Sequence, residues 1–147
     1  MPGRREEQKL ERRERIFRAA MGRFENVGYE ATTVLDIAKA AKVSRGTVFN
    51  YYPYKEALLI EHFANNLHDI RTQLGTRSVF KELYFIFEAL ANFVNTNRHL
   101  ILPLSYELLN PDPERSRKAF MSLPLAEMVY ELLTQAREQG LIRSDFS

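Results

Sequence analysis

Apolar residues recur at intervals of three and four positions along most of this chain, which is the spacing of helices with one buried face. No stretch shows the strict apolar–polar alternation of a half-buried β-strand. The pattern therefore predicts an all-α fold, with helix ends at proline and glycine because both disfavour a helix interior. The predicted helices cover residues 4–26, 33–41, 44–52, 53–74, 78–96, 98–109 and 114–139, the last interrupted at Pro124.

Residues 33–52 predict two short helices joined by a tight turn. Thr33 suits an N-cap, and Asp36 follows at the spacing of a capping box. Ser44 suits the N-cap of the second helix, whose inward face repeats at Val48 and Tyr52. This is the helix-turn-helix arrangement, in which the second helix enters the DNA major groove. An ordinary helical hairpin inside an all-α core is the alternative interpretation.

The outward face of the second short helix favours the DNA-binding interpretation. It presents one cation, several hydrogen-bonding groups and no carboxylate, whereas a merely solvated helix usually includes acidic residues. No Asp or Glu occurs between Asp36 and Glu56, although four Lys or Arg residues lie in or beside that interval. The exposed set comprises Arg45, Gly46, Thr47, Phe49, Asn50 and Tyr51.

The stretch GYEATTVLDIAKAAKVSRGTVFNYYPYKEALL resembles the DNA-binding signature of the TetR family of bacterial transcriptional regulators. The resemblance covers roughly the first half of the chain and extends back through Ile16, Ala20 and Phe24. It implies a three-helix DNA-binding domain over residues 10–70 and a helical effector-binding and dimerisation domain over residues 71–147. Family members usually carry two further helices, so it also implies a second domain that is shortened at its C-terminus.

The resemblance also implies which residues contact DNA. Arg45 is the best candidate to read a guanine, with a phosphate contact as the alternative. Tyr51 and Lys55 resemble phosphate-binding positions, and Phe49 stands where the family commonly has Tyr. Lys42 stands where the family usually has Gly, so we expect a left-handed backbone there. The candidate DNA-binding residues are Thr33, Lys42, Ser44, Arg45, Gly46, Thr47, Phe49, Asn50, Tyr51 and Lys55.

Charge is distributed unevenly along the chain. Residues 1–55 contain 12 Lys/Arg and 7 Asp/Glu, a net charge of +5, and the remainder contains 9 and 12, a net charge of −3. A basic N-terminal half fits a DNA-binding domain attached to a body that need not touch DNA. The highly charged start of the first helix is either a solvated helix end or a set of phosphate contacts from Arg4, Arg5 and Lys9.

Composition narrows the remaining function classes. The chain has no cysteine, which excludes disulfides and cysteine metal sites and fits a cytoplasmic location. No apolar run approaches a membrane span, and no motif predicts a metal, a cofactor or a catalytic nucleophile, so we expect a protein that is not an enzyme. The expected partners are a double-stranded DNA operator, an unknown small-molecule effector and a second copy of the chain in a homodimer.

The second half of the chain is rich in aromatic residues and methionine, which predicts either plain core packing or an effector pocket. The candidate effector-contacting residues are Tyr84, Phe87, Phe93, Tyr106, Phe120, Met121, Met128 and Tyr130. The preferred function is a ligand-responsive repressor that binds a palindromic operator as a dimer. The alternative is a helical protein- or ligand-binding module whose DNA-binding head is degenerate.

Overall fold

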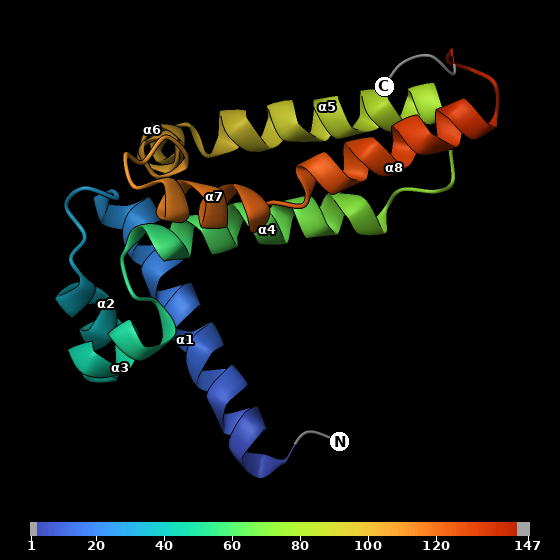
Figure 1. Cartoon of the computed structure of the whole chain (residues 1–147). Coiled ribbons are helices and arrows are strands. Elements are labelled where there is room, and N and C mark those ends of the chain that lie inside the picture. The colour runs from blue at the N-terminus through green and yellow to red at the C-terminus, as the bar shows by residue number, and fades with distance from the viewer. Residues whose placement is uncertain (1–2, 144–147) are drawn as a thin grey trace.

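The computed structural model describes residues 3–143, and within that range eight helices and no strand make up the fold (Figure 1). The all-α prediction is thereby confirmed. The helices are α1 (Arg4–Val27), α2 (Val34–Ala40), α3 (Arg45–Tyr51), α4 (Glu56–Thr72), α5 (Val79–Thr96), α6 (Arg98–Leu108), α7 (Pro113–Met121) and α8 (Leu125–Glu138). No helix between residues 3 and 143 combines the length and apolar character needed to cross a bilayer.

Two helix boundaries differ from the prediction. Helix α4 begins at Glu56 rather than at Pro53, and Lys55, the residue before its first turn, supplies no side-chain cap. The pattern predicted as one interrupted helix over residues 114–139 is two separate helices, α7 and α8. The chain turns at Pro124, which becomes the residue preceding α8. By contrast, Pro103 lies inside a continuous α6.

The predicted three-helix core of the head, formed by α1, α2 and α3, is confirmed. One face of α1 packs against α2, α3 and the start of α4, and the central side chains are almost completely buried. A further bond fixes α1 to the helix-turn-helix, because Arg15 donates to the carbonyl of Ala41 at 2.9 Å. The buried members are Ile16, Ala20, Phe24, Ile37, Ala38, Val48, Tyr52 and Leu58, with Phe17 and Val43 at the edge.

The helix-turn-helix forms through the local signals read from the sequence. Thr33 and Asp36 make the reciprocal capping box, with the Asp36 N–H on the Thr33 hydroxyl and the Thr33 N–H on the Asp36 carboxylate. Ser44 caps α3 by accepting the Thr47 N–H at 3.0 Å. Lys42 has φ of 55°, so the expected left-handed residue lies in the turn between α2 and α3.

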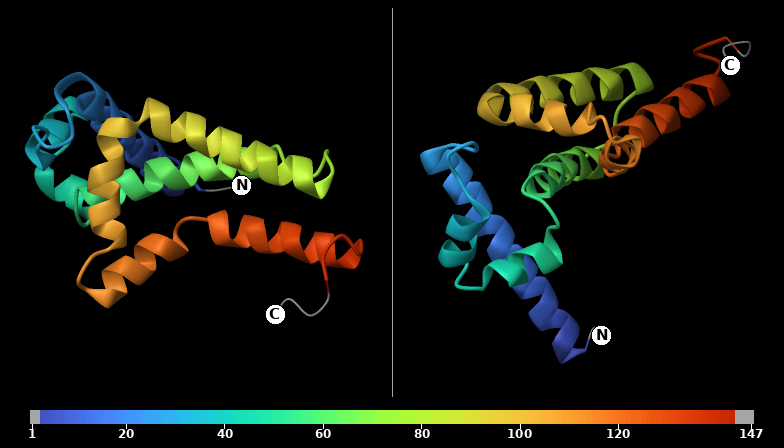
Figure 2. Two further views of the ribbon diagram at one scale, coloured as in Figure 1. Left: turned by 90° about the horizontal axis from the view of Figure 1, so that it is seen from above. Right: turned by 60° about the vertical axis from the view of Figure 1, so that its left-hand side comes forward.

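The body, α4 to α8, rests directly on the head (Figure 2). Helix α6 crosses the head-proximal end of α4, and α8 lies alongside α5 farther from the head. The cluster that stabilises the head continues through Leu59 and Phe63 of α4 to Leu100 of α6 and Ala119 of α7. A second cluster, which includes Ile86 and Met128, holds α4, α5 and α8 together. Movement of α6 or α7 would therefore change the packing of the head.

Candidate nucleic-acid interface and effector groove

Helix α3 presents the predicted reading face to solvent. Arg45, Gly46 and Asn50 are exposed, and Phe49 is 36% exposed. Val48 and Tyr52 on the opposite face are 1% and 2% exposed, so the core sets the rotation of α3 about its own axis. The Arg45 guanidinium lies 5.3 Å from the centre of the Phe49 ring, which holds this cation at the exposed surface.

The other residues predicted to contact DNA differ in their solvent exposure and in the hydrogen bonds they make within the chain. Lys42 and Ser44 are exposed, whereas Thr47 and Tyr51 are half-buried and Tyr51 packs partly against the head core. The hydroxyls of Ser44 and Thr47 lie 2.8 Å apart and bond to each other. Thr33 is exposed but its hydroxyl donates to Asp36, and this contact lowers the pKa of that carboxyl.

The Lys55 side chain does not point freely into solvent but is held by contacts with the loop before α2. Its ammonium group donates to the carbonyls of Tyr29 and Thr32 at 2.9 and 3.2 Å, and it lies 3.9 Å from the centre of the Tyr29 ring. The lysine therefore connects the linker before α4 to the loop before α2. Its predicted phosphate contact would have to come from the same ammonium group, which has three donors.

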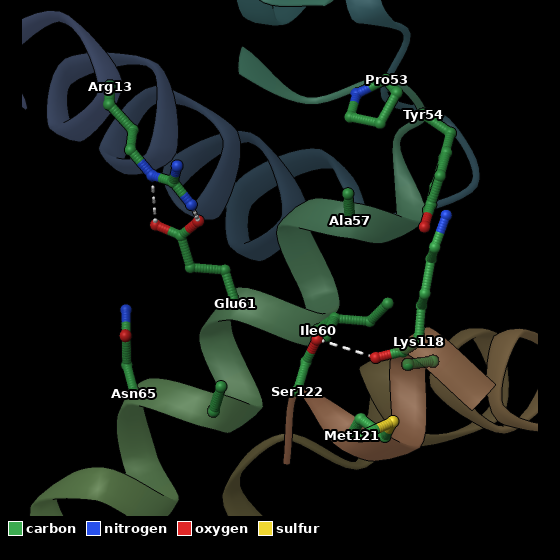
Figure 3. Close-up of a pocket in the computed structure, with 12 residues that line it drawn as sticks. Arg13, Pro53, Tyr54, Ala57, Ile60, Glu61, Asn65, Lys118, Met121 and Ser122 are labelled. Atoms are coloured by element: carbon green, nitrogen blue, oxygen red, sulfur yellow. Dashed lines mark hydrogen bonds and ion pairs between the residues drawn. The ribbon is translucent and has the colours of Figure 1, made fainter. Parts of the chain in front are cut away.

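A groove runs between α4 and α7 where the body meets the head (Figure 3). Its larger part has a volume of about 800 Å³ and continues toward α8 into a part of about 550 Å³. The walls are mainly apolar, with Ile60 and Ala64 on α4 and Met121 on α7. Two cations line it, but Arg13 pairs with Glu61 and Lys118 pairs with Glu114. The groove therefore offers an apolar floor with charge at its head-facing end.

The residues predicted to contact an effector do not gather around this groove as a set. Phe120 and Met121 line it, at 54% and 74% exposed. Met128 is fully buried in the core, and Phe93 packs against the Phe63 ring at 4.8 Å. The other four project into solvent at 66–72% exposed, namely Tyr84, Phe87, Tyr106 and Tyr130. Periodicity identified apolar helix faces but not the direction in which each face points.

Sequence reasoning missed the contacts that Arg115 makes within the body and with the linker. Arg115 on α7 donates to Glu107 on α6 at 2.9 and 2.6 Å, and its guanidinium lies 4.1 Å from the Tyr54 ring in the linker. These hydrogen bonds raise the pKa of Arg115. Glu107 is 2% exposed, although nothing in its sequence context distinguishes it from a surface glutamate. Only its inward position on the amphipathic pattern of α6 could have indicated burial.

Tyr52 joins three elements of the head and body. Its hydroxyl donates to Glu61 on α4 at 3.0 Å, and Arg13 of α1 pairs with the same carboxylate. Burial and the neighbouring Glu61 carboxylate raise the pKa of Tyr52, so the phenol remains protonated and keeps donating at neutral pH. Among residues 3–143, no group of three or more His, Asp or Glu side chains is arranged to hold a metal ion.

Family profiles match both halves of the chain. The profile of bacterial regulatory proteins of the TetR family matches residues 16–62. The profile of the C-terminal domain of TetR/AcrR family transcriptional repressors matches residues 58–147. Among curated proteins, the HTH-type transcriptional regulator HbdR from Aromatoleum sp. (strain CIB) is 42% identical over 57 residues, which are 39% of this chain and 25% of HbdR.

Solved structures extend the similarity through the body. FadR from Thermus thermophilus, a TetR-family repressor solved in complex with lauroyl-CoA, is 49% identical with a TM-score of 0.82, covering 92% of this chain and 72% of that protein. The fatty acid degradation regulator FadR from Bacillus halodurans is 26% identical with a TM-score of 0.66, covering 92% and 74%. From the two profiles and these relatives, the chain belongs to the TetR/AcrR family of transcriptional repressors.

Proposed function

We propose that this protein is a repressor that binds a palindromic operator as a homodimer and releases it when a fatty acyl-coenzyme A binds. The exposed face of α3 supports DNA binding, because Arg45 and Asn50 project from a helix whose opposite side is fixed in the core. Helix-turn-helix proteins read two half-sites related by the two-fold axis of the dimer. A regulator of this kind acts in the cytoplasm, where DNA and acyl thioesters meet.

The proposed effector class follows from the relative and from the groove. The Thermus thermophilus relative was solved with lauroyl-CoA, and it is similar to this chain through the body as well as the head. The groove between α4 and α7 offers Ile60, Ala64 and Met121 to an acyl chain. Lys118 and His68 lie along its rim, where the phosphates of coenzyme A would find cationic or hydrogen-bonding groups.

The position of the groove suggests how binding would change DNA affinity. Its walls include Arg13 of the head and Tyr54 of the linker as well as α7 of the body. A ligand seated there would press on the contacts that set the angle between head and body. In a dimer, that angle decides whether two copies of α3 match successive major grooves.

Selection from a randomised duplex pool, followed by titration with lauroyl-CoA, tests both parts. We expect enrichment of an inverted repeat and a 5- to 150-fold loss of affinity with saturating lauroyl-CoA, the range of about 1–3 kcal/mol found for allosteric coupling. Laurate and coenzyme A supplied separately should have little effect. Ala64→Trp, which fills the groove, should bind the operator normally and respond weakly to lauroyl-CoA.

The two parts can fail separately. A pool without any enriched sequence would contradict DNA reading and favour the protein-binding alternative. Enrichment of a repeat with no response to lauroyl-CoA would contradict only the effector class. A normal response by Ala64→Trp would place the effector outside the groove between α4 and α7.

A further inference from the structure

The N-terminal end of α1 projects beyond the other helices (Figure 1). Residues 3–15 are all exposed, and Ile16 is the first buried side chain. At 1.5 Å per residue, the exposed segment from Arg4 to Arg15 is about 18 Å long. It projects on the side of the body that also carries α2 and α3 (Figures 1 and 2).

The charges on this segment are sorted by helix face. Arg5, Lys9 and Arg12 recur at i, i+4 and i+7, which places them within an arc of about 60°. We call these three residues the basic stripe. Glu7, Glu11 and Glu14 repeat the same spacing and occupy an arc of similar width on nearly the opposite side. These two sets therefore form one cationic edge and one anionic edge, and Arg4, Glu6, Arg13 and Arg15 lie between them.

Helix stability does not explain this sorting. Like charges at i, i+4, as in Arg5–Lys9 and Glu7–Glu11, each destabilise a helix by about 0.2–0.5 kcal/mol, whereas opposite charges at that spacing stabilise it. Within residues 3–143, none of the three stripe cations makes an ion pair or a hydrogen bond. The one i, i+4 ion pair within α1 is Glu14–Arg18 at 3.3 Å, outside the stripe. The cationic edge thus has charge that the chain itself leaves unmatched.

The basic stripe borders the helix that reads DNA. Lys9 lies with Glu6, Leu10 and Arg13 beside Tyr51 at the end of α3, around a surface hollow of about 390 Å³. Because Lys9 belongs to the stripe, the cationic edge continues the exposed surface of α3. The acidic edge lies on the far side of α1 from the stripe. Beside α3, a polyanion would therefore meet two cations on α1, Lys9 and Arg13, and one carboxylate, Glu6.

We propose that Arg5, Lys9 and Arg12 form a second DNA contact, binding phosphates of the duplex that flanks the base pairs read by α3. This inference rests on the proposed DNA binding and adds a surface to it. The three side chains are long, exposed and unpaired, so they suit phosphates rather than base edges. They contribute to affinity and its salt dependence, while α3 provides sequence preference.

Salt titration of a triple variant provides the test. Arg5→Gln/Lys9→Gln/Arg12→Gln removes the cations and retains a good helix former at each position. On the selected operator, we expect the plot of log affinity against log salt concentration to become shallower by about 2 to 3 units, since each phosphate contact contributes about 0.9. The ranking of sequences in the randomised pool should not change.

A charge-matched control separates local contact from overall charge. Lys81→Gln/Arg98→Gln/Arg137→Gln also removes three cations, from exposed positions on the body. We expect its salt dependence to stay within about half a unit of the parent, since charges beyond a Debye length of about 10 Å are largely screened. Equal changes in the two triple variants would overturn the basic stripe as a contact surface.

Trimming the duplex locates the contact. Removing base pairs outside the inverted repeat should weaken the parent protein and flatten its salt dependence, but should scarcely affect the stripe variant, because both changes remove the same phosphates. Additive losses would place the stripe away from the flank and contradict the proposal. A parent protein that binds no duplex at any salt concentration would instead refute DNA binding itself.

Discussion

Arg115 on α7 holds the carboxylate of Glu107 on α6 through two hydrogen bonds of 2.9 and 2.6 Å. Glu107 is 2% exposed, so removing this cation would leave a buried carboxylate without its charged partner. We expect Arg115→Met, which keeps the apolar stem and removes the guanidinium, to lower the free energy of unfolding by about 3 kcal/mol. Urea denaturation measures this loss.

Arg71 provides the matched control for Arg115. Its side chain is 35% exposed, against 36% for Arg115, and it pairs with two carboxylates, as Arg115 does with Glu107 and Glu56. Its partners Glu127 and Glu131 are 72% and 55% exposed, so water can replace the lost cation. Arg71→Met should cost less than about 1 kcal/mol. Equal losses of unfolding free energy in the two variants would show that burial of the partner carboxylate does not determine the loss.

Glu82 should make stability depend on acid pH. Its carboxylate is 1% exposed and accepts backbone N–H groups of Gly75, Thr76 and Arg77 at 2.7–3.0 Å. Burial alone would raise its pKa, but these bonds and the Arg77 side chain outweigh burial and hold the pKa below the ordinary 4.5. The folded state therefore binds the proton less readily than the unfolded chain does. The stabilisation of the fold by the charged Glu82 carboxylate is fully present at pH values above the ordinary pKa.

That stabilisation should disappear as the pH falls through the folded-state pKa. We expect Glu82→Gln to be about 2 kcal/mol less stable than the parent at pH 7, because bonds to a charged acceptor become bonds to a neutral one. The difference should shrink as the pH falls below the ordinary pKa of 4.5 and the parent carboxylate takes up a proton. Urea denaturation across this range measures it, and a constant difference would contradict a role for the Glu82 charge.

Arg45 should determine preference at one operator position. Its guanidinium is exposed on the first turn of α3 and lies against the Phe49 ring. We expect Arg45→Ala to relax discrimination at one base pair by about 1–3 kcal/mol, measured by sequencing bound fragments from a randomised pool. Uniform weakening across all sequences would assign Arg45 to a phosphate instead.

Phe24 should matter to DNA binding although it cannot touch DNA. It is 1% exposed in the head core and packs on Tyr29 at a ring distance of 4.9 Å. Phe24→Ala should destabilise the protein by about 3–5 kcal/mol and abolish operator binding by loosening α3. Phe120→Ala, at a side chain 54% exposed, should change stability by no more than about 0.5 kcal/mol. Calorimetry and DNA titration of both variants check the contrast.

Local signals made the head predictable. The capping residues Thr33 and Ser44, the left-handed Lys42 and the inward pair Val48 and Tyr52 all depend on neighbours within a few positions. Such interactions are present in the sequence itself, so the position of α3 and its exposed face followed from them. The start of α4 was misplaced because Pro53 was assigned to the helix, whereas the linker continues through Lys55.

The sequence by itself determined the all-α fold, the helix-turn-helix and the side of α3 that faces solvent, because helix periodicity and caps are local. Only the tertiary structure decided where the outward faces of the body helices lie, so Tyr84 and Phe87 of α5 proved exposed. It alone brought Arg115 to Glu107 within the body and to Tyr54 of the linker, and Lys55 of the linker to Thr32 of the head. Those contacts depend on how helices cross, and crossing geometry arises from packing between residues distant in the chain.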